Sequence, residues 1–172
     1  GERIPPKGRG AGYNPPNRFD PLHSEIELET VQDDADYLEG LRRPETEFLD
    51  DRSRTIIAEN QSPDVGFDSS VNPYRGCEHG CIYCYARPTH EYLGMSAGLD
   101  FETKIMVKRD APALLRAALE SPKWRPRVLA MSGVTDPYQP IERKLRLTRG
   151  CLEVMAEFRQ AVTIVTKNRL VV

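Results

Sequence analysis

The run Cys77-Glu78-His79-Gly80-Cys81-Ile82-Tyr83-Cys84 places three of the chain's four cysteines in the spacing C-x3-C-x2-C. The fourth cysteine, Cys151, lies far along the chain. Three clustered thiolates are typical of an iron–sulfur cubane that takes its remaining ligand from elsewhere. A structural zinc site normally closes with four protein ligands, often as two C-x2-C pairs, and only one half of such a pattern is present. The run therefore predicts a loop whose metal keeps one position open for a substrate or cofactor.

A zinc site is the alternative interpretation of the same cysteines. His79 or His90 would complete a Cys3His ligand set, which is chemically reasonable. His79 lies between two ligands, where we expect the loop to point it away. Gly76 and Gly80 suit a ligand loop because glycine tolerates a positive φ and close backbone approach. Zinc does not explain the motifs further along the chain, so the cluster is the favoured interpretation.

Apolar runs alternate with amphipathic segments after residue 68, which is the order of a parallel α/β sheet. We expect strands at 68–74, 101–108, 128–132 and 162–166. Helices are expected at 85–93, from Asp110 onward, and at 145–158. The helix that begins at Asp110 has Pro112 in its first turn, and its apolar stripe is Ala111, Leu114, Leu115, Ala118 and Leu119.

Polar motifs directly follow three of the expected strands. The cysteines follow 68–74, Thr135-Asp136 follow 128–132, and Lys167 follows 162–166. Ligands of parallel sheets gather at the carboxyl ends of the strands, so we expect these motifs to converge on one rim. Cys151 lies on the apolar stripe of the helix at 145–158. It is interpreted as a core residue rather than a fourth ligand or a hydrogen-atom donor.

The cysteine run resembles the signature of the radical S-adenosylmethionine (SAM) superfamily, C-x3-C-x-aromatic-C, with Tyr83 as the aromatic residue. The segments 70–76 (SVNPYRG), 84–88 (CYARP), 135–142 (TDPYQPIE) and 166–167 (TK) are similar to the branch related to spore photoproduct lyase. Segments 7–11 (KGRGA) and 47–49 (EFL) resemble an uncharacterised bacterial subgroup of that branch.

The resemblance implies a fold, a cofactor and an activity. The fold is a partial (β/α)6 barrel, of which residues 68–172 would be the N-terminal portion, incomplete at the C-terminus, after an irregular extension at 1–67. Cys77, Cys81 and Cys84 would hold a [4Fe-4S] cluster. The expected reaction is reductive cleavage of SAM to a 5′-deoxyadenosyl radical, which abstracts hydrogen from an unidentified substrate. A lyase acting on a DNA lesion is one candidate, with flavodoxin or ferredoxin as the electron donor.

The same resemblance implies which residues contact SAM, although each also has a structural interpretation. Tyr83 would stack on the adenine, or support the loop by hydrophobic packing. The other expected SAM contacts are Ser132, Gly133, Thr135, Asp136 and Lys167. The family's usual Gly-Gly-Glu is absent here, Asp136-Pro137 is also an ordinary turn signal, and Lys167 is also an ordinary surface cation.

The composition of the chain limits its possible partners and location. The 172 residues carry a formal net charge of −2, which gives no support to nucleic-acid binding through bulk charge. No apolar run has the length of a membrane span, and clustered cysteines without a signal peptide favour the cytoplasm.

Residues 1–67 are expected to form an extended arm that packs through Phe19, Leu22, Phe48 and Leu49, or a disordered tail. We expect this piece alone to be inactive; the competing function is a non-enzymatic, zinc-stabilised module that binds a partner or nucleic acid.

Overall fold

The computed structural model describes residues 9–19, 45–61 and 66–171 of the chain. They belong to two compact units. Unit 1 lies within Gly1–Phe48 and Gly76–Ile105, and unit 2 within Leu49–Arg75 and Met106–Val172. The boundary between the units falls inside strands β1 (Glu47–Asp50) and β5 (Lys104–Val107). The division into an extension and a catalytic core at residues 67/68 stays a prediction.

Unit 2 contains a four-stranded sheet in the order β2-β3-β6-β7. The strands are β2 (Ile57–Glu59), β3 (Ser69–Val71), β6 (Leu129–Ala130) and β7 (Val162–Thr163). Strands β3, β6 and β7 are parallel, whereas β2 runs antiparallel to β3 along the edge. The α/β class is therefore confirmed, with a mixed rather than a purely parallel sheet.

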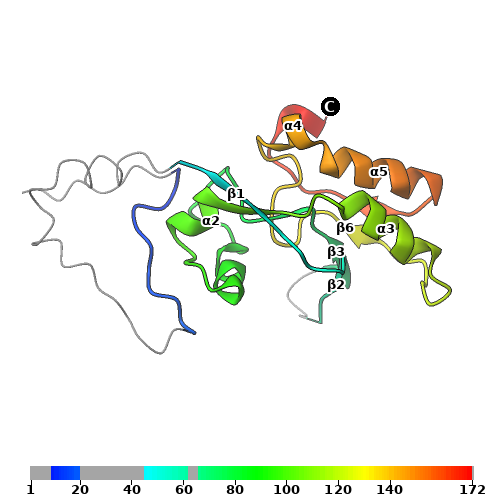
Figure 1. Ribbon diagram of the computed structural model, residues 1–172, viewed down its shortest axis with the longest axis horizontal. Helices are drawn as coiled ribbons and strands as arrows, with labels where there is room; N and C mark the ends of the chain where they lie inside the picture. Colours follow the sequence, from blue (N-terminus) through cyan, green and yellow to red (C-terminus); the bar gives the residue numbers. More distant parts are fainter. Residues whose placement is uncertain (1–8, 20–44, 62–65, 172) are drawn as a thin grey trace, which may run out of the picture. The chain divides into compact units, whose positions relative to one another are not determined.

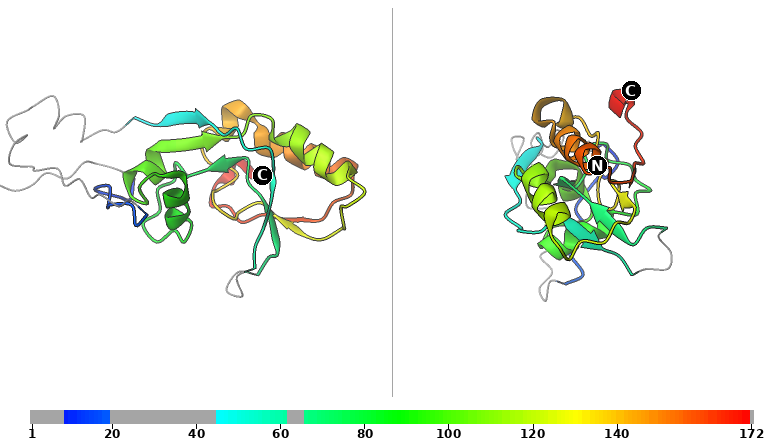
Figure 2. Two further views of the ribbon diagram at one scale, coloured as in Figure 1. Left: turned by 60° about the horizontal axis from the view of Figure 1, so that its bottom comes forward. Right: turned by 90° about the vertical axis from the view of Figure 1, so that its right-hand side faces the viewer.

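Helices α3 (Ala111–Glu120) and α5 (Leu147–Glu157) pack against each other and cover one face of this sheet (Figures 1 and 2). Gly150 permits their close approach, because a Cβ there would lie 2.8 Å from Pro112 Cγ. The core between sheet and helices is formed by Ile56, Val71, Ala111, Leu115, Leu119, Leu129, Met131, Cys151, Val154 and Met155. The apolar stripe predicted for the helix that begins at Asp110, which is α3, and the core position predicted for Cys151 are both confirmed.

Two of the expected elements differ in their bounds from the elements of the structure. The strand expected at 68–74 becomes β3 and β4 (Tyr74–Arg75), which belong to different sheets, since Pro73 between them has no N–H to donate. The helix expected at 145–158 is α5, which begins at Leu147 because Arg146 before it has a left-handed φ of 53°. A short helix that was not predicted, α4 (Glu142–Leu145), precedes it. A 3-10 turn, η2 (Arg169–Val171), follows β7.

The strand expected at 101–108 is wrong in its first part. Residues Leu99–Thr103 form helix α2, and only Lys104–Val107 form strand β5, which lies between β1 and β4 in a second sheet. Phe101 and its neighbour Glu102 are both fully buried. Consecutive side chains in a strand point to opposite faces, whereas a helical turn lets both enter the interior of unit 1.

The helix expected at 85–93 is the 3-10 helix η1 (Arg87–Leu93), which ends as predicted at Gly94, where φ is 72°. The arm at residues 9–19 packs on unit 1 mainly through polar contacts: Asn14 bonds Asp100, and Ser96 Oγ donates to Pro15 O. Phe19 is 55% exposed, and its ring packs against that of Tyr92 with 5.3 Å between the centroids; Leu22 lies outside the described residues. Among those residues, we find no helix long and apolar enough to cross a membrane.

Candidate functional site

Residues 76–87, here called the cysteine loop, form a series of turns that each begin at a cysteine. The carbonyl of Cys77 accepts a hydrogen bond from Gly80 N at 3.1 Å. Cys81 O accepts from Cys84 N at 3.2 Å, and Cys84 O accepts from Arg87 N at 3.3 Å. Gly80 has a φ of 60°, a conformation that glycine adopts without strain. The local sequence thus wraps the backbone tightly and keeps all three thiols in one loop.

The three thiols differ in burial. Cys77 is 6% exposed and packs with Ala86 and Phe101, whereas Cys81 and Cys84 are half-buried. All are thiols rather than disulfides. Within the described ranges, no three His, Cys, Asp or Glu side chains are gathered closely enough to hold a metal. A metal group held by all three thiols would therefore require them to turn toward one another.

His90, one of the two histidines that could complete a zinc site, lies in the interior of unit 1. Its ring is fully buried, its Nε2 lies 3.0 Å from the carbonyl of Lys104, and its edge faces the ring of Phe101. Burial lowers the pKa of His90, outweighing its hydrogen bond to Lys104. The ring is therefore held as a neutral core side chain.

The Arg87 guanidinium holds the cysteine loop from inside. Its Nε donates to Cys81 O at 2.9 Å and one Nη donates to Gly80 O at 2.9 Å. Its other Nη donates to the carbonyls of Ala97 and Gly98. Together with a bond to Glu102, these contacts use all five N–H donors of the side chain. Arg87 therefore fixes the backbone of a predicted ligand, rather than only anchoring the helix that follows.

Glu102 is the buried counter-charge of Arg87, with a distance of 2.7 Å between Arg87 Nη2 and Glu102 Oε1. Its carboxylate also accepts the backbone N–H groups of Arg9 at 2.7 Å, Gly10 at 3.0 Å and Ala11 at 2.6 Å. Removing one member of such a buried pair typically costs about 3–5 kcal/mol, because the other charge is left without compensation. Glu102 was not among the predicted site residues, because its place in an expected strand gave no sign of burial.

Two glycines allow the arm to lie directly on the cysteine loop. A Cβ on Gly10 would lie 1.8 Å from Gly80 O and 2.8 Å from Ile82 Cγ2. A Cβ on Gly80 would lie 2.4 Å from Arg9 Cβ and 2.6 Å from Glu102 Oε2. Larger residues at either position would push the two segments apart.

The outer side of the cysteine loop presents apolar side chains to solvent. Tyr83 is 83% exposed, Ile82 is 72% exposed and Tyr85 is 64% exposed. Tyr83 therefore does not support the loop by packing against the described residues, which is the structural interpretation of this aromatic. Its exposed ring is compatible with a stacking partner that is not part of the chain.

In unit 2, residues 132–139 follow β6 and are here called the Asp136 loop. Asp136 Oδ1 accepts from Thr166 Oγ1 at 2.7 Å and from Tyr138 N at 2.8 Å. Asp136 Oδ2 accepts from the backbone N–H of Lys167 at 3.1 Å. The motifs after β6 and β7 therefore meet as predicted, but through the main chain of Lys167, whose side chain is exposed.

The other predicted residues of the Asp136 loop are also tied to neighbouring backbone. Ser132 Oγ bonds both the N–H and the carbonyl of Val165, which extends the pairing of β6 with β7. Gly133 lies against β3, since a Cβ there would be 2.9 Å from Ser70 Oγ. Thr135 is buried and accepts from Gln139 Nε2 at 3.0 Å. These contacts give the loop a defined shape at the carboxyl ends of the parallel strands.

A buried acid and phenol lie beneath this region. Tyr74 donates its hydroxyl to Glu142, whose other oxygen accepts from Arg149 N at 3.1 Å. Burial and then this bond raise the pKa of Tyr74. Burial and the Glu142 charge raise the pKa of Cys151 from 9.0 to about 12. Glu142 is thus a structural acceptor in the interior of unit 2.

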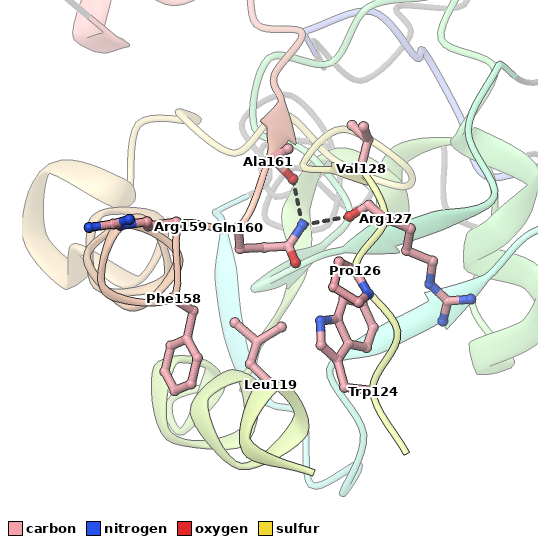
Figure 3. Close-up of a pocket in the computed structure, with 9 residues that line it drawn as sticks. All are labelled: Leu119, Trp124, Pro126, Arg127, Val128, Phe158, Arg159, Gln160 and Ala161. Atoms are coloured by element: carbon pink, nitrogen blue, oxygen red, sulfur yellow. Dashed lines mark hydrogen bonds between the residues drawn. The ribbon is translucent and has the colours of Figure 1, made fainter. Parts of the chain in front are cut away.

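A hollow of about 400 Å³ opens at the other end of the sheet, lined by residues that directly precede β6 and β7 (Figure 3). Trp124, Phe158 and Leu119 supply its apolar wall, and the Gln160 amide bridges the carbonyls of Arg127 and Ala161. Ligands of parallel sheets bind at the carboxyl ends of the strands, so this hollow is not the predicted site.

Comparison with known proteins finds uncharacterised relatives. An uncharacterised protein of Mycobacterium tuberculosis is 44% identical over 104 residues, which are 60% of this chain and 31% of the relative. An uncharacterised protein of Mycobacterium bovis matches to the same extent. One from Methanocaldococcus jannaschii is 33% identical over 101 residues, 59% of this chain and 36% of the relative. The match thus spans about a third of each relative, and no family model and no solved structure matches.

Proposed function

We propose that the complete protein is a radical SAM enzyme whose [4Fe-4S] cluster is bound by Cys77, Cys81 and Cys84. The observation that carries the proposal is the cysteine loop itself: three thiols on successive turns, with the backbone of Cys81 fixed from inside by Arg87. When bound, such a cluster supplies the electron that cleaves SAM and so generates the radical that abstracts hydrogen. On this proposal, unit 2 is part of an incomplete (β/α)6 barrel.

The chain's own contribution is to hold thiolates and to orient ligands. Thiolates rather than thiols bind metal, and Arg87 holds the backbone carbonyl of Cys81, one of the proposed ligands. The proposal keeps Tyr83 as the adenine contact, because its ring is exposed. It also keeps Ser132, Gly133, Thr135, Asp136 and Lys167 as SAM contacts, on the strength of the family resemblance.

The bonds of the Asp136 loop refine these assignments. The carboxylate of Asp136 already accepts from Thr166, Tyr138 and the Lys167 backbone. We therefore assign it the role of shaping the loop, so that backbone carbonyls and hydroxyls meet the methionine ammonium. The ammonium of Lys167 is assigned to the SAM carboxylate, because its side chain is exposed.

The test is anaerobic reconstitution of the full-length protein with iron and sulfide. We expect about four iron atoms per chain, a brown chromophore and dithionite-dependent formation of 5′-deoxyadenosine. Changing Cys77, Cys81 or Cys84 to alanine should abolish stable cluster binding, because each thiolate is a ligand. The matched control, Cys151→Ala, should keep the cluster, because Cys151 packs in the core of unit 2.

Two results would contradict the proposal. One is full cluster content in a variant that lacks all three loop cysteines. The other is stoichiometric zinc without a chromophore after reconstitution, which would favour a zinc-stabilised binding module instead.

A further inference from the structure

The Glu102 carboxylate connects two segments that are distant in sequence. The arm residues Arg9, Gly10 and Ala11 donate their backbone N–H groups to it, and Arg87 donates from the cysteine loop. In addition, the side chain of Arg9 donates to the carbonyl of Glu102 at 2.6 Å. We call these five residues the Glu102 clamp. Glu102 is fully buried, whereas Gly10 and Ala11 are half-buried and Arg9 is exposed, so the clamp ties a surface segment to a buried carboxylate.

The clamp reaches the cysteine loop at two points. Arg87 holds the carbonyls of Gly80 and Cys81, so the backbone of one predicted ligand is fixed by the same guanidinium that pairs with Glu102. Gly10 also lies directly against Gly80 and Ile82. The loop between Cys77 and Cys84 is therefore in contact with both the buried ion pair and the arm.

We propose that Glu102 is the positioning residue of the cysteine loop, and that Arg9, Gly10 and Ala11 help it to hold the loop in place by packing against Gly80 and Ile82. The identity of the metal group rests on the proposed function above, whereas the clamp itself is a property of the metal-free chain. The ligand thiols must turn toward one another on binding. A backbone already fixed at Gly80 and Cys81 loses less conformational freedom on binding, which lowers the entropic cost of that change.

Hydrogen-bonding partners of metal ligands typically change metal affinity about 10–100-fold when they are mutated. Glu102 acts on a predicted ligand indirectly, because it bonds Arg87, and Arg87 in turn bonds the backbone of Cys81. Replacing Glu102 with glutamine keeps the shape of the side chain but removes its charge. It also leaves an amide NH2 facing N–H donors from Arg9, Gly10, Ala11 or Arg87.

The first experiment uses full-length protein without metal and measures hydrogen exchange. In Glu102→Gln we expect amides of residues 9–11 and 80–87 to exchange at least about tenfold faster, with α3 and α5 unchanged. The matched control is Glu157→Gln, which removes a carboxylate from an exposed ion pair with Arg116. Unchanged exchange at residues 9–11 and 80–87 would overturn the clamp, whatever metal the loop binds.

The second experiment measures loss of the reconstituted cluster to an iron chelator. We expect loss to be about tenfold faster or more in Glu102→Gln, with Glu102→Asp intermediate because it keeps the charge on a shorter side chain. Gly10→Ala tests the contact between the arm and the loop without changing any charge. Its new Cβ would collide with Gly80 O and so push the two segments apart. Its control is Gly66→Ala, where a Cβ meets nothing within 4 Å.

The two experiments separate the two proposals. If wild-type protein binds no cluster, the proposed function fails, and hydrogen exchange still decides the clamp. If wild-type protein binds the cluster but Glu102→Gln and Gly10→Ala lose it at the wild-type rate, the positioning role is wrong and the proposed function stands. Should Glu102→Gln fail to fold, Gly10→Ala decides in the same way.

Discussion

The cysteine loop of unit 1 and the Asp136 loop of unit 2 are held by different physical means. Around the cysteine loop, a buried carboxylate and a guanidinium with all its donors engaged draw together residues about ninety positions apart in sequence. The Asp136 loop extends from parallel strands whose apolar side chains pack on two helices. The first loop therefore depends on charge and on distant segments, and the second depends on a hydrophobic core with polar contacts at its edge.

The largest expected difference concerns the chemical reactivity of the cysteines in the two units. The pKa of Cys151 is raised from 9.0 to about 12, chiefly by burial, so its thiolate is about a thousandfold scarcer than that of an ordinary cysteine below pH 9. In metal-free native protein, Cys81 and Cys84 should be alkylated at pH 8 well before Cys151. Mass spectrometry of timed iodoacetamide reactions measures this order. Alkylation of Cys151 as fast as the loop cysteines would contradict the burial of the unit 2 core.

The next prediction concerns the apolar core of unit 2. Leu115 is fully buried between α3 and the sheet, so Leu115→Ala should lower the free energy of unfolding by about 2–5 kcal/mol. Chemical denaturation followed by helical circular dichroism measures the loss. Leu152→Ala on α5 is the control and should cost less, because Leu152 is only partly buried. An equal loss of unfolding free energy in Leu115→Ala and Leu152→Ala would show that the core does not lie where these contacts place it.

The smallest of these effects concerns the polar edge of unit 2. Asp136→Ala removes the acceptor of three hydrogen bonds, from Thr166, Tyr138 and the Lys167 backbone. It should lower the free energy of unfolding by about 1–3 kcal/mol. Asp136→Asn keeps acceptor capacity on one oxygen and should cost less. Thermal unfolding of both variants, with hydrogen exchange at residues 165–168, measures the effect. If residues 165–168 exchange at the wild-type rate in Asp136→Ala, the loop is held without the Asp136 carboxylate.

The apolar pattern predicted unit 2 better than unit 1. The stripe at Ala111, Leu115 and Leu119, and the inward position of Cys151, follow from periodicity alone, because burial of apolar surface favours one face of a helix in any tertiary context. The strand at 101–108 failed because its start carries a charged residue that is buried. A sequence gives no sign that a glutamate will find four partners elsewhere.

The sequence by itself determined the three-cysteine loop, its glycine turns, the order of strands and helices in unit 2, and the place of polar motifs after the strands. These depend on local spacing and on the one-dimensional apolar pattern. Only the tertiary structure decided that Glu102 is buried, that Arg87 holds the Cys81 backbone, and that the arm from Arg9 to Ala11 lies on the loop. The physical reason is that a buried charge is stable only with partners in the right geometry, and those partners lie far away in the chain.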